Sequence, residues 1–195
     1  MNKLLYKIKQ FNSLAEIDEI ARRYFALNSF DGILMILGII IANFFASTDN
    51  PNIIITTAIG ATVAVTVSGM WGAYLTESAE RKGKMKKLEK STGLSFKKTP
   101  MHRAHRFATI SLALINGLSS LFAALIIIMP FLLPIHMKTA YFISICLAFL
   151  VLFLIGIFLG NISKSNLFIA GIKLLLAGII CSVIIYIIEY WSVII

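Results

Sequence analysis

Long runs of apolar residues, separated by short polar stretches, dominate the sequence. Five of these runs are long enough to cross a bilayer as helices, since a crossing takes about 20 helical residues. They lie at 24–47, 52–77, 107–129, 139–160 and 167–189. The pattern therefore predicts an all-α membrane protein with five transmembrane helices.

A shorter amphipathic segment precedes the first run. In SLAEIDEIARRY, Ser13 and Glu16 have the spacing of a capping box, and apolar residues then recur at helical intervals among acids and arginines. This pattern predicts an amphipathic interfacial helix within residues 1–23, lying on the inner membrane surface. A helix packed on the polar loop 78–106 is the alternative.

The distribution of lysine and arginine predicts the orientation. Five basic residues precede the first run and ten lie in loop 78–106, whereas the turn at 47–52 has none. Because basic loops stay on the cytoplasmic side, we expect the N-terminus and loop 78–106 inside and the C-terminus outside. The second helix should extend into the loop and end near Gly93, since glycine suits a helix C-terminus.

Composition supports a membrane protein and excludes several other classes. The 195 residues are 58% hydrophobic and 14% charged, where soluble domains carry about 25% charged residues. The net charge of +9 comes from residues that bracket the apolar runs, so we expect no nucleic-acid partner. No Walker, GxGxxG, HExxH or GxSxG motif occurs, and the chain is not expected to be an enzyme. The lysine- and isoleucine-rich composition favours a prokaryotic cell membrane over a vacuole.

An aspartate inside the first apolar run is the main candidate for function. Asp31 would cost roughly 2.5–3.5 kcal/mol at the centre of a membrane helix, and such acids usually face a cavity. Asn28 and Met35 share its helical face. The simpler role for Asp31 is that of a helix cap or a partner of Arg22 or Arg23. For Met35 the simpler role is packing. The following Gly32 leaves room for a close helix contact or a cation.

Antiparallel geometry gives Asp31 a possible partner in the second run. Asp31 lies about 10 Å from the inner end of its helix, and Met70 lies at the same depth, seven residues before Glu77. A carboxylate with a thioether favours an intermediate transition ion such as Fe²⁺, Mn²⁺ or Co²⁺. Protonation of Asp31 would release the metal and couple its movement to protons.

Two glutamates mark the inner end of the second run. Glu77 and Glu80 are one helical turn apart and would form a carboxylate pair at the mouth of a pathway. The alternative is that they are interfacial charges paired with Arg81 and Lys84, four residues further on.

Three motifs together resemble the vacuolar iron transporter family. They are SFDGIL in the first run, SGMWGAYLTESAERK at the end of the second, and INGLSSLFAALIIIMPFLLP in the third. The resemblance implies a homodimer that exchanges Fe²⁺ or Mn²⁺ for protons, with no permanently bound cofactor. It assigns translocation to Asp31 and Met70, and matches Glu77 and Glu80 to the family's inner glutamates.

The chain also departs from that family. Loop 78–106 is too short and basic to form the glutamate-rich metal-binding domain of plant-type members, and Ala73 stands where many relatives carry an acid. For dimer packing, Gly156 and Gly160 form a GxxxG motif that predicts a close helix contact. The alternative function is a membrane scaffold or accessory subunit that docks a partner or anionic lipid through its basic loop.

Overall fold

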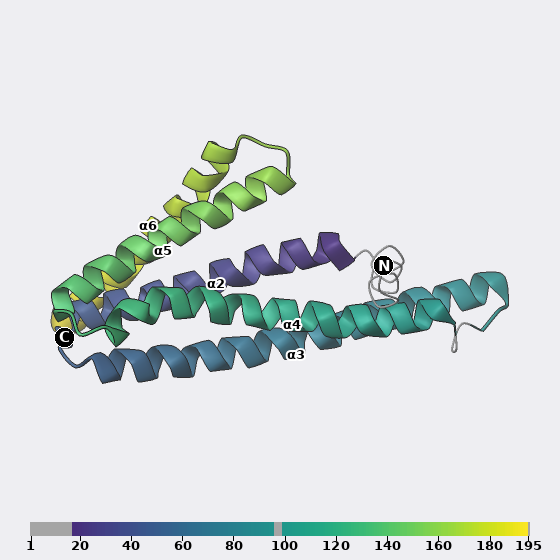
Figure 1. The fold of residues 1–195 in the computed structure, drawn as a ribbon, viewed down its shortest axis with the longest axis horizontal. Coiled ribbons are helices and arrows are strands. Elements are labelled where there is room, and N and C mark those ends of the chain that lie inside the picture. Colours follow the sequence, from purple (N-terminus) through teal and green to yellow (C-terminus); the bar gives the residue numbers. More distant parts are fainter. Residues whose placement is uncertain (1–16, 96–98, 195) are drawn as a thin grey trace. The chain divides into compact units, whose positions relative to one another are not determined.

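The computed structural model describes residues 17–95 and 99–194 and places them almost entirely in helices (Figure 1). Five helices are long and apolar enough to cross a membrane, and no β-strand occurs in this part of the chain. This confirms the all-α, five-helix prediction. A short 3₁₀ helix, η1 (Met129–Leu132), follows the third long helix. The long helices are α2 (Ile17–Phe45), α3 (Pro51–Thr92), α4 (Pro100–Ile128), α5 (Met137–Ile162) and α6 (Leu167–Ile194).

Helix α2 starts earlier than the first apolar run. It begins at Ile17 and continues without a break through the expected boundary at residues 23 and 24. No glycine or proline lies between Ile17 and Asp31 to interrupt it. The described part of the predicted interfacial helix, residues 17–23, is therefore continuous with the first apolar helix. The capping box at Ser13 and Glu16 lies outside the described residues.

Helix α3 extends well past the second apolar run and ends where the sequence predicts. Its last residue is Thr92, and Gly93 adopts a left-handed φ of 69°. The Gly93 N–H donates a 3.0 Å hydrogen bond to the carbonyl of Glu89, which closes the helix end. The charged segment after Glu77 is thus mostly helical.

The described chain divides into two compact units. The first contains residues 17–25 of α2, the part of α3 from Thr66 onward, and α4 up to Leu118. The second contains the rest of these three helices with η1, α5 and α6. Its apolar core is built from fully buried side chains such as Ile36, Ile40, Ile127 and Leu152.

Helices α5 and α6 pack closely in the second unit through small residues. A Cβ added to Gly156 would lie 2.6 Å from the Cα of Gly171, and one added to Gly160 would lie 2.8 Å from the Cβ of Ala170. Small residues let helix backbones approach in a membrane, where van der Waals contact replaces the hydrophobic effect between helices. The GxxxG motif therefore makes a contact within the chain, which corrects its assignment to dimer packing.

We expect Gly156→Ala to destabilise the α5–α6 pair, because the new methyl group would meet the backbone of α6 rather than a flexible side chain. The expected loss in the free energy of unfolding is about 1–3 kcal/mol, the usual cost of adding a carbon atom to a well-packed site. Thermal unfolding in detergent measures it. Gly83→Ala is the control, since nothing lies within 4 Å of its added Cβ. Equal stability of the two variants would contradict the close contact.

Candidate functional site

Asp31 lies on α2 beside a close contact between α2 and α4 in the second unit. A Cβ on Gly32 would lie 2.8 Å from the carbonyl oxygen of Ser120. The buried Ser29 hydroxyl donates a 3.4 Å hydrogen bond to the Ser119 carbonyl. The side chain of Asp31 is exposed in the single chain. Gly32 therefore has one of its two predicted roles, a close helix contact. The carboxylate of the neighbouring Asp31 lies outside this contact.

The other two predicted residues on this helix are more enclosed than Asp31. Asn28 is half-buried, and Met35 packs against the apolar core of the second unit. Met35 thus has the packing role that was the alternative to a ligand role.

Met70 packs against a glycine of α4 in the first unit. A Cβ on Gly117 would lie 2.1 Å from Cγ of Met70 and 3.0 Å from its sulfur. Beside it, Asn116 Nδ2 donates a 2.8 Å hydrogen bond to the carbonyl of Gly69. Asn116 therefore joins α4 to α3. This role is typical of a polar side chain within an apolar run. Met70 and Asp31 belong to different units, so their pairing stays a prediction.

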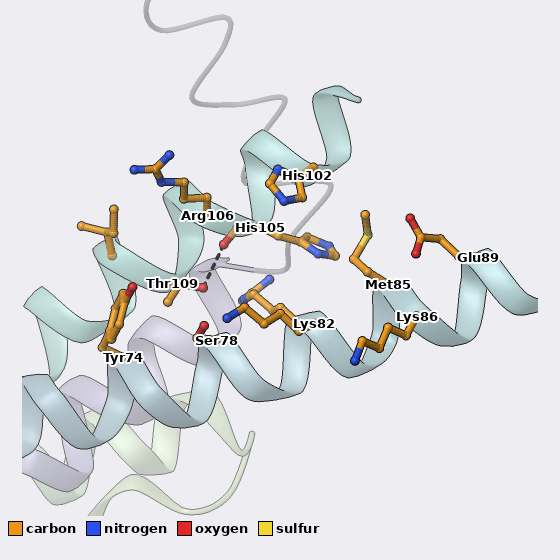
Figure 2. A pocket seen from close by; sticks show the side chains of 12 residues that line it. Tyr74, Ser78, Lys82, Met85, Lys86, Glu89, His102, His105, Arg106 and Thr109 are labelled. Carbon is orange, nitrogen blue, oxygen red and sulfur yellow. Dashed lines mark hydrogen bonds between the residues drawn. The ribbon is translucent and has the colours of Figure 1, made fainter. Parts of the chain in front are cut away.

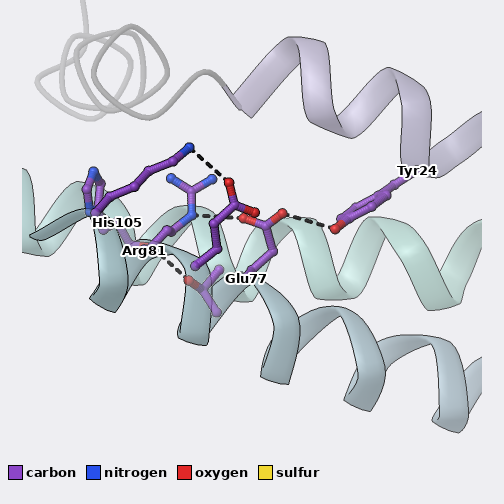
Figure 3. Close-up of polar contacts among 7 residues, drawn as sticks. Tyr24, Glu77, Arg81 and His105 are labelled. Carbon is purple, nitrogen blue, oxygen red and sulfur yellow. Dashed lines mark hydrogen bonds and ion pairs between the residues drawn. The ribbon is translucent and has the colours of Figure 1, made fainter. Parts of the chain in front are cut away.

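Glu77 forms a buried ion pair at the end of the second apolar run (Figure 3). Arg81 Nε donates to Glu77 Oε2 at 2.9 Å, and the Tyr24 hydroxyl donates to Glu77 Oε1 at 3.0 Å. Glu77 is only 4% exposed and Arg81 8% exposed. Each carboxylate oxygen of Glu77 thus accepts a hydrogen bond, and its charge is balanced by the arginine.

Glu80 makes a similar pair in a different environment. Lys84 Nζ lies 3.0 Å from Glu80 Oε1, and both side chains are more than half exposed. Both glutamates therefore form the i,i+4 pairs that were the alternative to a free carboxylate pair. Exposed pairs of this kind contribute about 0.3–0.5 kcal/mol to the free energy of unfolding. Removing one partner of a buried pair costs more, because the other charge is then buried without compensation.

A cavity of about 400 Å³ lies between α3 and α4 in the first unit (Figure 2). Cationic, histidine and apolar side chains share its lining, and Glu89 is its one carboxylate among the described residues. No group of three or more histidine, cysteine or acidic side chains suited to a metal occurs in the described ranges 17–95 and 99–194. The basic residues that line the cavity are Arg81, Lys82, Lys86, His102, His105 and Arg106.

Sequence reasoning missed two features of this region. Tyr24 completes the Glu77 pair from 53 residues away, a distance at which periodicity carries no information. The cavity was also missed, although its signal was present. On α3, Tyr74, Ser78, Lys82, Lys86 and Glu89 recur every three or four residues, which places them on one helical face.

The helices and their polar contacts define the class of protein. Five apolar helices, with polar groups paired between or along them, make this chain a multi-pass, all-helical membrane protein. The chain belongs to the same family as the uncharacterized protein MJ0645 of the archaeon Methanocaldococcus jannaschii. The two are 31% identical over 175 residues, which cover 88% of this chain and 90% of the relative. No family model matches the chain, and no solved structure matches it.

The buried pair gives a sharp test of stability. Glu77→Gln removes the carboxylate that balances the charge of the buried Arg81, so we expect a loss of about 3–5 kcal/mol in the free energy of unfolding. Chemical unfolding in detergent measures this loss. Glu80→Gln removes a carboxylate with the same spacing on the same helix and should change stability by less than about 0.5 kcal/mol.

The double variant Glu77→Gln/Arg81→Gln should recover part of the stability lost in Glu77→Gln, because it leaves no uncompensated charge. A Glu77→Gln variant as stable as Glu80→Gln would contradict the burial of the pair.

Proposed function

We propose that this protein is a proton-coupled transporter that moves a divalent metal ion, Fe²⁺ or Mn²⁺, out of the cytoplasm. The observation that carries the proposal is the carboxylate of Asp31, exposed in the single chain on a helix apolar enough to cross a membrane. The resemblance to the vacuolar iron transporter family supports the same reading.

The environment of Asp31 favours a function over a structural role. A carboxylate facing lipid is costly, and acids within membrane helices usually face a bundle interior or a water-filled cavity. Gly32 and Ser29 already make the packing contact of this helix with α4. No ion pair of Asp31 occurs among the described residues. A polar pathway or a second subunit beside Asp31 would relieve the cost.

The proposed ligands select the class of ion. A carboxylate at Asp31 supplies the charge that a divalent cation needs, and a thioether at Met70 would favour Fe²⁺ or Mn²⁺ over Mg²⁺ or Ca²⁺. In this proposal two chains form a homodimer, and the pathway lies at their interface, as the family resemblance implies. A proton that binds Asp31 displaces the metal, so each ion exchanges with protons.

Loading of the metal requires a different arrangement from that in plant-type relatives. Glu77 and Glu80 are both paired with basic side chains, so a metal at this end of the pathway must compete with Arg81 and Lys84. The exposed Glu80 is the more accessible of the two, since its partner is also exposed. We therefore propose Glu80 as the first contact and Glu77 as a later one.

A scaffold or accessory subunit is the second candidate. The observation that favours it is the basic cavity on the charged ends of α3 and α4, which is suited to an acidic ligand. Loss of a soluble protein partner after neutralisation of the loop lysines would support this reading over transport.

Asp31→Asn should reduce metal uptake by more than roughly 10–100-fold, because this is already the cost of losing a residue that only supports a metal ligand. The assay places purified protein in liposomes and follows Mn²⁺ or Fe²⁺ uptake together with a lumenal pH dye. Asp49→Asn is the control, because Asp49 is exposed in the turn between α2 and α3. Uptake that is unchanged in Asp31→Asn would overturn the site, and no metal-dependent flux in the unaltered protein would overturn the function.

Met70→Leu separates a ligand role from a packing role. Leucine keeps the volume against Gly117 but removes the sulfur, so folding should be little affected, with a change below about 1.5 kcal/mol. If sulfur binds the metal, uptake of Fe²⁺ and Mn²⁺ should fall while thermal unfolding stays nearly unchanged. Met35→Leu, in the apolar core of the second unit, is the matched control. Full uptake by Met70→Leu would leave Met70 with packing alone.

A further inference from the structure

The cavity between α3 and α4 concentrates positive charge. Four permanently charged cations, Arg81, Lys82, Lys86 and Arg106, line it against one carboxylate, Glu89. Arg81 is already balanced by Glu77. Lys82, Lys86 and Arg106 are exposed and form no ion pair with the described residues. The cavity therefore has a surplus of positive charge on side chains able to turn toward a ligand.

The start of α4 adds to this field. His102 lines the cavity from the first turn of a 29-residue helix, close to the helix N-terminus. The backbone dipoles of a helix leave a partial positive charge at this end, which favours anions. The charge of the cavity thus comes from both helices and is complementary to phosphate rather than to a metal ion.

The remaining walls of the cavity are apolar. Tyr74, Met85 and Ile110 contribute to its lining. On the membrane side, the same faces continue into two exposed apolar side chains, Trp71 at 65% and Leu114 at 42% exposure. The Trp71 ring lies 6.3 Å from that of Tyr74. The basic cavity is thus followed, along the same helix faces, by exposed apolar side chains. A molecule with both a charged headgroup and an apolar chain matches this arrangement.

The position along the helices also fits such a molecule. The cavity spans the level at which the apolar runs end, near residue 77 on α3, and begin, near residue 107 on α4. Anionic headgroups lie at this level on the cytoplasmic side of a membrane, and basic pockets between membrane helices bind them.

We propose that this cavity binds the phosphate headgroup of an anionic phospholipid. Lys82, Lys86 and Arg106 contact the phosphate, and the acyl chains lie along Trp71 and Leu114. A soluble phosphate would contact the same basic side chains but would leave Trp71 and Leu114 uncovered. The assignment does not depend on transport, since it uses residues apart from Asp31 and Met70.

Native mass spectrometry of the full chain tests the headgroup contacts. Protein in neutral detergent is titrated with phosphatidylglycerol or phosphatidylcholine, and the bound lipid is counted. We expect the protein to prefer phosphatidylglycerol, and Lys82→Gln/Arg106→Gln to weaken that binding by roughly tenfold or more, since each basic residue contributes at an anionic surface. Lys87→Gln/Lys90→Gln is the control, because it removes the same charge from residues of α3 that do not line the cavity.

Each other result of this titration overturns the proposal. An equal loss in both double variants would mean that net charge alone attracts the lipid. Equal binding of the two lipids would remove the headgroup preference. Competition by inorganic phosphate at the same concentration as the lipid would assign the cavity to a soluble phosphate instead.

Tryptophan fluorescence tests the acyl-chain contact independently. Trp191→Phe leaves Trp71 as the one tryptophan of the chain. In phosphatidylcholine vesicles, a small fraction of brominated phosphatidylglycerol should quench Trp71 more than the same fraction of brominated phosphatidylcholine. Lys82→Gln/Arg106→Gln should abolish the difference, while Lys87→Gln/Lys90→Gln keeps it. Equal quenching by both lipids in the Trp191→Phe protein would contradict the proposed pose.

Discussion

The structure depends on satisfying polar groups in a chain whose surroundings are largely hydrocarbon. An unsatisfied polar group costs several kcal/mol there, which favours a helical backbone and a partner for each buried polar side chain; Thr66, His105 and Ser144 each keep one buried polar atom without a hydrogen bond to the described residues. Asn116 meets this requirement with the carbonyl of Gly69, and Glu77 meets it with Arg81 and Tyr24. These contacts fix α3 against α4 and against the start of α2 within the first unit, and Arg81 also lines the cavity between α3 and α4.

Much of the fold could be predicted from hydrophobic periodicity and terminal residues. Run length identified five helices, and Gly93 marked the end of α3 because a left-handed residue suits glycine. Partners across the fold could not be predicted in the same way. Glu77 and Glu80 each have a basic residue four positions further on, yet the first pair is buried and the second exposed. Gly156 was expected to face a second chain, whereas the turn after α5 returns α6 onto it.

The candidate site divides into residues that pack, residues that pair and one carboxylate outside both groups. Met35 and Met70 make packing contacts, and Glu77 and Glu80 each pair with a basic residue. The rare acid Asp31 could be identified from the sequence, because the free-energy cost of its carboxylate follows from its position in an apolar run. It could not separate ligand from packing for methionine, since both roles need the same helical spacing. The cavity could be predicted only in part, because one face of α3 carries its polar residues but the lining also needs α4.

The Glu77–Arg81 pair also changes the length of α3 that a bilayer can accept. Residues 51–76 carry no charge, and the pairing of Glu77 with Arg81 extends this stretch to Ala79, just before the exposed Glu80. The resulting stretch, Pro51 to Ala79, is about 43 Å long, whereas a typical hydrocarbon core is about 30 Å thick. A helix of this length fits by tilting or by thickening the surrounding bilayer. Bilayer thickness thus becomes a variable that acts on the tilt of α3.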